Sequence, residues 1–128
     1  MIKDFIPYEQ ALELKELGFK EPCFEYWKMK NWIIQEKTRT DGYTHADQVC
    51  GSVLYQQAFR WFREKYHLFH TILEYNKDGS LIIEITKDKI EVFRKMTNFD
   101  ISEYQTVEIE CLKKLIEICK DENIRKSP

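Results

Sequence analysis

The sequence predicts an α+β fold, in which an antiparallel sheet of about four to five strands packs against three helices in the order α-β-β-α-β-β-(β)-α. The first supporting observation is an aromatic-rich helical segment, residues 53–66, that runs directly into a β-hairpin. The second is the Asp78-Gly79 pair between two apolar runs, because this dipeptide tolerates the positive φ angles of a tight hairpin turn. The third is the chain order, since hairpins followed by helices favour an antiparallel sheet with helices over one face.

Three segments carry apolar residues at helical spacing and are predicted to be helices. Pro7 suits the first position of the first helix, and Gly18 supplies its C-terminal stop. Ser52 can cap the second helix, and Ser102 has capping-box spacing to Gln105 in the third. The three helices are expected at about Tyr8–Leu17, Val53–Tyr66 and Glu103–Lys120.

Strands are predicted where aromatic and β-branched residues cluster between turn formers. The polar segment Thr38–Gly51 is rich in turn formers and is expected to be a surface loop. Residues 1–120 are long enough for one hydrophobic core and are expected to form a single α+β domain, with 121–128 as a polar, frayed tail. The strands are expected at about Cys23–Met29, Trp32–Lys37, Leu68–Asn76, Leu81–Lys87 and Ile90–Thr97.

The charge and hydropathy of the chain restrict its partners and its compartment. The 20 Lys and Arg residues nearly balance the 22 Asp and Glu residues, and the net charge of −2 offers no overall attraction to nucleic acid or to an anionic membrane. No apolar run approaches the roughly 20 residues that span a bilayer, and the N-terminal MIKDFIPYEQ lacks the apolar region of a signal peptide. We therefore expect a cytoplasmic protein without membrane contact.

The four cysteines are expected to be free thiols, most of them in the core. No two of them have C-x-x-C spacing. Cys111 and Cys119 are eight residues apart on a predicted helix, which separates them by about 12 Å. That distance is too long for a disulfide bond within a helix.

Two arrangements of histidine and cysteine are candidate sites. His67 and His70 are three residues apart, with His45 and Cys50 upstream, but the pattern lacks the ligand spacing of a zinc site, so no metal or other cofactor is expected. Cys50 precedes a predicted helix N-terminus, where the helix dipole could lower its pKa, and His45 could act as its base. No nucleophile motif surrounds this pair, so an ordinary loop cysteine is favoured and no enzymatic activity is expected.

The aromatic content suggests an interaction surface. Eighteen residues are aromatic (3 Trp, 7 Tyr and 8 Phe), which is many for one small core, and surplus Tyr and Trp are typical of binding hot spots. The segment Cys23–Trp32 carries large apolar groups in both phases of a strand, so one face could meet a protein partner or a second copy of the chain. A sheet covered on both faces within the monomer would explain the same pattern. The candidate interaction surface comprises Phe24, Tyr26, Trp27, Trp32 and Tyr43.

Basic and aromatic side chains also occur together, with Arg60, Arg63 and Lys65 beside Trp61 and Tyr66. Such combinations form stacking platforms for single-stranded nucleic acid. Trp61 nevertheless lies on the apolar stripe of its helix, so burial is the simpler expectation. Weak nucleic-acid binding is therefore the alternative function, and a cysteine-dependent enzyme is the second alternative.

The sequence also contains three recognisable blocks in a fixed order: YEQALELKELGF followed by EPC (Tyr8–Cys23), YQQAFRWFREKY (Tyr55–Tyr66) and CLKKLIEI (Cys111–Ile118). Together they resemble a group of small proteins of unknown activity carried by Bacteroidetes, their phages and other mobile elements. The resemblance implies a phage or mobile-element origin and the host cytosol as compartment, and it implies no catalytic or ligand-binding residue. We expect a small cytosolic interaction protein that binds a host or phage protein, for example to modulate a defence system, or that self-associates.

Overall fold

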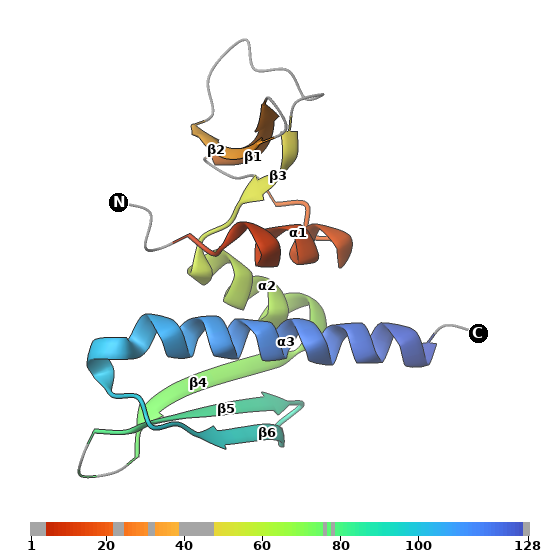
Figure 1. Ribbon diagram of the computed structural model, residues 1–128. Coiled ribbons are helices and arrows are strands. Elements are labelled where there is room, and N and C mark those ends of the chain that lie inside the picture. The colour runs from red at the N-terminus through yellow and green to blue at the C-terminus, as the bar shows by residue number, and fades with distance from the viewer. Residues whose placement is uncertain are drawn as a thin grey trace. The chain divides into compact units, whose positions relative to one another are not determined.

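The structure is a computed structural model that describes residues 5–21, 25–30, 33–38, 48–75, 77 and 79–126 (Figure 1). For residues 25–30, 33–38, 48–52 and 124–126 it describes the backbone alone. The chain divides into two compact units, Met1–Ala58 and Phe59–Pro128. Helices and strands occur in both units, so the predicted α+β class is confirmed. A single domain over residues 1–120 stays a prediction.

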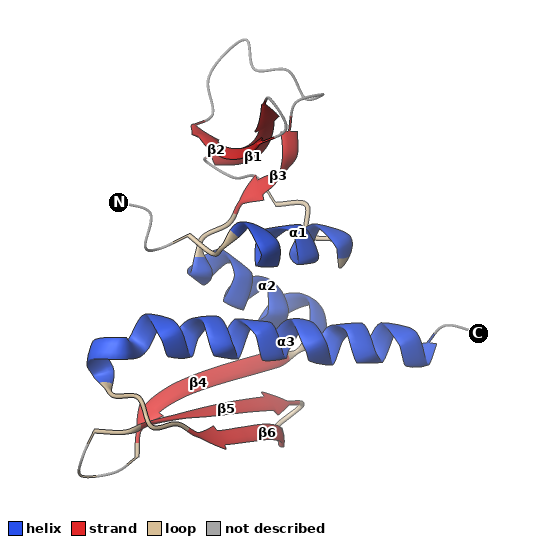
Figure 2. Ribbon diagram, in the orientation of Figure 1, coloured by secondary structure: helices blue, strands red, loops and turns tan. Residues whose placement is uncertain are grey.

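The described strands form two antiparallel sheets of three strands each, in place of the predicted single sheet of about four to five strands (Figure 2). The order of the elements agrees with the prediction except for an additional strand at residues 48–52. This strand pairs with the first strand of the chain. The two strands of the first predicted hairpin and this additional strand therefore form a sheet separate from the second one.

The first unit contains α1 (Tyr8–Glu16) and a sheet in the order β2-β1-β3, formed by β1 (Glu25–Lys30), β2 (Ile33–Thr38) and β3 (Gln48–Ser52). Gly18 ends α1 as predicted, with a φ of 105° that favours glycine. The Ile6 N–H donates to the Val53 carbonyl oxygen at 2.8 Å. This bond joins the segment before α1 to the segment after β3.

The prediction of one loop over Thr38–Gly51 is wrong at both ends of the segment. Thr38 is the last residue of β2, and residues 48–51 lie in β3. Backbone pairing of β3 with β1 overrides the weak strand preference of a polar segment. Residues 39–47 lie outside the described residues.

The helix α2 (Tyr55–Tyr66) agrees with the predicted central helix apart from its start. Ser52, predicted as its cap, is the last residue of β3. The Leu54 N–H instead donates to Gln57 Oε1 at 3.1 Å. The glutamine side chain thus satisfies a backbone donor next to the helix start, where donors lack partners within the helix.

The second unit contains a sheet in the order β4-β5-β6 and the helix α3 (Tyr104–Lys126), which follows a short 3-10 turn at Ile101–Glu103. The strands are β4 (Leu68–Glu74), β5 (Leu81–Lys87) and β6 (Ile90–Met96). The predicted β4–β5 hairpin is confirmed, and Gly79 in its turn has a φ of 85°. α3 continues through residues 121–126, predicted as a frayed tail, and Glu122 in this extension forms an ion pair with Lys87 of β5.

α3 lies along one face of this sheet (Figure 1). Residues that lie opposite each other in an antiparallel sheet share a face, and Ile85 lies opposite both His70 and Phe93. Lys114 Nζ of α3 lies 4.8 Å from the centre of the Phe93 ring. The face that carries these three sheet residues is therefore the inner face, covered by α3. The buried core includes Leu68, Leu81, Ile83 and Ile85 of the sheet and Val107, Cys111, Leu112, Leu115, Ile116 and Cys119 of α3.

Candidate functional site

The residues that the sequence singles out for partner binding lie outside the described side chains. Phe24, Trp32 and Tyr43 lie outside the described residues altogether. Tyr26 and Trp27 are described only as backbone residues of β1. This candidate surface therefore stays a prediction.

The predicted thiol site also stays a prediction. His45 lies outside the described residues, and Cys50 is described only by its backbone in β3. Cys111 and Cys119 of α3 are free and buried, which confirms their predicted place in the core. Burial raises the pKa of each of these two thiols to about 12. Both therefore stay protonated and unreactive near neutral pH.

The two histidines of the candidate metal site lie in different environments. His67 joins α2 to β4 with a φ of 57° and is exposed, whereas the His70 ring stacks on Phe59 with 3.8 Å between ring centres. Burial, aided by the positive charge of Arg63, lowers the pKa of His70 to about 4. Among the described residues, no three His, Cys, Asp or Glu side chains form a group that could hold a metal ion.

Trp61, the centre of the possible nucleic-acid platform, is only 7% exposed. Its ring packs edge-on against Phe62 at 5.2 Å and against Tyr66 at 5.4 Å between ring centres. Lys65 Nζ lies 5.5 Å from the centre of the Trp61 ring. The predicted burial of Trp61 is confirmed, and its ring offers no open surface on which a base could stack.

Exposed apolar side chains gather instead on the outer face of the β4-β5-β6 sheet, opposite α3. Leu73, Ile82 and Met96 lie opposite one another across the three strands and form one apolar row. Leu73 is 48% and Met96 58% exposed, whereas Ile82 between them is buried. Phe69, also 48% exposed, shares this face. The outer face comprises Phe69, Thr71, Leu73, Ile82, Glu84, Thr86, Glu91, Arg94 and Met96.

A charged row crosses the same face beside the apolar one. Glu84 of β5 lies opposite Arg94 of β6, and their side chains approach to 3.9 Å. Arg94 also lies 4.0 Å from Glu91. Since these charges have partners within the sheet, the apolar row is the part of the outer face that would gain free energy on burial.

The dimensions of the sheet set the size of the interface that the outer face can supply. Each strand is 7 residues long, so the sheet measures about 23 Å by about 14 Å and has a footprint of about 330 Å². A standard stable interface takes about 800 Å² from each partner, so the outer face alone suits the centre of a small interface.

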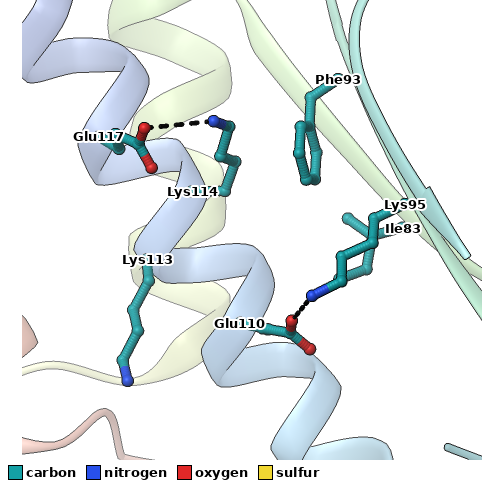
Figure 3. Close-up of a pocket in the computed structure, with 7 residues that line it drawn as sticks. All are labelled: Ile83, Phe93, Lys95, Glu110, Lys113, Lys114 and Glu117. Atoms are coloured by element: carbon teal, nitrogen blue, oxygen red, sulfur yellow. Dashed lines mark hydrogen bonds and ion pairs between the residues drawn. The ribbon is translucent and has the colours of Figure 1, made fainter. Parts of the chain in front are cut away.

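A groove lies between the inner side of β6 and α3, and Figure 3 shows the side chains that line it. Its volume is about 190 Å³. Lys95 of β6 forms an ion pair with Glu110 of α3, and Lys114 Nζ lies 3.3 Å from Glu117 Oε1. Lys113 extends from α3 away from the Phe93 ring (Figure 3). The lining of this β6–α3 groove comprises Ile83, Phe93, Lys95, Glu110, Lys113, Lys114 and Glu117.

The outer face is absent from the sequence-based predictions, although a signal for it exists. The segment LFHTILEY, residues 68–75, carries large apolar residues in both phases, with Leu68 and Ile72 in one and Phe69 and Leu73 in the other. A strand covered by a helix on one side needs apolar residues in one phase only. Large apolar residues in both phases of a strand are the reason for predicting an exposed face at Cys23–Trp32, and β4 has the same pattern.

No protein-family model matches this sequence, and no curated protein or solved structure is significantly similar to it. Among the described residues, no helix is both long enough and apolar enough to cross a membrane. The function is therefore inferred from the geometry of the second unit.

Proposed function

We propose that this chain is a small, non-enzymatic interaction protein that binds a second protein through the outer face of the β4-β5-β6 sheet. The apolar row Leu73–Ile82–Met96 carries this proposal, because two of its three side chains are about half exposed. Covering the exposed half of Leu73 and of Met96 would stabilise a complex by about 1 kcal/mol for each side chain.

The footprint of the face also bears on the kind of complex. An interface centred on about 330 Å² of sheet falls in the range of transient complexes unless it extends beyond the sheet. The resemblance to phage and mobile-element proteins supports a host or phage protein as the partner, such as a component of a defence system. A second copy of the chain is the alternative occupant.

Photo-crosslinking in cells that carry the gene tests the proposal. The variant Leu73→p-benzoylphenylalanine should yield a discrete cross-linked product, because position 73 lies in the apolar row. The matched control is Asp121→p-benzoylphenylalanine, which places the same group at an exposed position of α3. Equal yields from positions 73 and 121 would overturn the proposal.

A second variant ties the product to the apolar row. Cross-linking from Phe69→p-benzoylphenylalanine, on the same face, should be lost when Leu73→Glu is added, because a buried carboxylate without a partner is costly. Mass spectrometry of the product identifies the occupant. A product of twice the chain mass would replace the foreign partner by a second copy.

A further inference from the structure

β6 is an edge strand, and within the described part of the chain its second edge pairs with no other strand. The Thr97 N–H donates to the Leu81 carbonyl oxygen at 2.9 Å, directly after β6. Backbone groups point alternately to the two sides along an antiparallel strand. Phe93 and Lys95 therefore direct their backbone groups toward β5, and Arg94 and Met96 direct theirs toward the free edge.

The free edge borders the β6–α3 groove. Phe93 and Lys95 point to the inner face and line this groove together with residues of α3. A strand that paired with Arg94 and Met96 would direct every second side chain toward α3. Those side chains would enter the groove beside the Phe93 ring. Edge pairing gives affinity in such complexes, and pockets for alternate side chains give specificity.

We propose that the β6 edge and the β6–α3 groove bind an extended, acidic segment of a partner protein by strand addition. The groove is lined by three lysines and two glutamates. Lys95 and Lys114 pair with the two glutamates, so the excess positive charge that complements a carboxylate is that of Lys113, which extends away from the Phe93 ring. Lys113 is exposed and forms no ion pair with the described residues. This inference rests on the proposed interaction function and adds the area that the outer face lacks.

A second copy of the chain fits this edge poorly. Antiparallel pairing of two β6 strands in a register centred on Arg94 and Lys95 would bring these residues of one copy beside the same residues of the other, and like charges across strands are destabilising. Positive charges on edge strands commonly prevent two copies of a protein from pairing at those strands. The same charges attract an acidic strand, so they favour an acidic segment of a partner protein over a second copy of β6.

Fluorescence anisotropy with two labelled peptides of about eight residues tests the inference. One peptide alternates valine with glutamate, and the other alternates valine with lysine. The full-length chain should bind the glutamate peptide about tenfold more tightly or better, and this affinity should fall as salt rises. The amides of Arg94 and Met96 should gain protection from hydrogen exchange when the glutamate peptide is bound.

Variants at the edge and in the groove separate backbone pairing from charge. Met96→Pro removes the outward N–H while sparing the bonds to β5 and should weaken binding of the glutamate peptide about tenfold relative to Met96→Ala, which keeps that N–H. Lys113→Glu, an exposed substitution on α3, should weaken the glutamate peptide and favour the lysine peptide. Unfolding midpoints of all three variants verify that each one is folded.

Equal affinity for the two peptides, or equal binding by Met96→Pro and Met96→Ala, would overturn the inference. A concentration-dependent dimer that Met96→Pro abolishes would overturn it as well, because it would assign the edge to a second copy. Cross-linking from position 73 does not depend on the edge. Loss of peptide binding with intact cross-linking would therefore reject strand addition alone, and the converse result would reject the outer-face proposal alone.

Discussion

The imidazole ring of His70 stacks on the phenyl ring of Phe59, with 3.8 Å between ring centres and 20° between ring planes. Phe59 belongs to α2 and His70 to β4, so the contact joins these two elements on either side of the connection at His67. Withdrawal from water disfavours the charged imidazolium. The pKa of His70 is lowered from 6.5 to about 4 for this reason, with a further contribution from Arg63.

This stack predicts a pH-dependent stability. Between pH 6.5 and about 4 the unfolded chain binds a proton at His70 that the folded chain does not bind, so the free energy of unfolding falls as the pH falls through this range. The contribution is fully present above pH 6.5. His70→Phe preserves a ring against Phe59 but removes the titrating group. The free energy of unfolding should therefore fall by about 2 kcal/mol less in this variant over the same pH range, a value that allows for the partial solvent access of His70. Urea unfolding at several pH values measures the difference between the two chains.

The control for this prediction is His67→Asn. His67 is exposed, and asparagine tolerates its positive φ, so the pH dependence should equal that of the unsubstituted chain. The prediction fails if His70→Phe and the unsubstituted chain lose stability in parallel between pH 6.5 and 4.

The ion pair between Lys87 of β5 and Glu122 of α3 predicts strong coupling between these two positions. Glu122 Oε2 is buried and has no hydrogen-bond partner among the described residues. Lys87→Met should cost about 2 kcal/mol, because it leaves a partly buried carboxylate without its cation. Lys87→Met combined with Glu122→Leu should recover most of that loss. A thermal-unfolding double-mutant cycle tests this, and strictly additive effects would contradict it.

The turn between β5 and β6 predicts a stabilising substitution. Asp88 and Lys89 have φ values of 51° and 71°, the left-handed conformation that two-residue hairpin turns require and that favours glycine. Lys89→Gly should raise the free energy of unfolding by about 0.5–1 kcal/mol, and Lys89→Val should lower it by a similar amount. Urea denaturation ranks the three chains, and a glycine variant less stable than the valine variant would refute the reasoning.

The buried thiols predict a pattern of chemical reactivity. Cys111 and Cys119 should resist iodoacetamide at pH 8 in the folded chain and react readily in urea, since burial raises the pKa of both to about 12. Peptide mapping by mass spectrometry after timed alkylation reads every cysteine separately. Native-state alkylation at the unfolded rate would show that α3 does not bury them. Rapid labelling of Cys50 in the same experiment would favour the cysteine-dependent enzyme.

The accuracy of the sequence-based predictions follows from the range of the interactions involved. The β4–β5 hairpin and its Gly79 turn were predictable because a turn and its flanking strands interact over a few residues. β3 was not predictable from its polar composition, because its strand conformation depends on pairing with residues of β1 that lie 20 to 27 positions earlier in the chain. The candidate binding surfaces of the second unit likewise depend on which phase of β4 and β6 faces α3.

The sequence by itself determined the α+β class, the three helices, the β4–β5 hairpin and the core position of Cys111, Cys119 and Trp61. Helical periodicity, turn chemistry and apolar stripes are local properties, so residues close in the chain encode them. Only the tertiary structure decided that the strands divide into two sheets, that Leu73 and Met96 stay exposed, and that the β6 edge borders a groove of α3. Each of these depends on contacts between distant segments, such as Lys95 with Glu110, and on a register in which a shift of one residue exchanges the two faces of a strand.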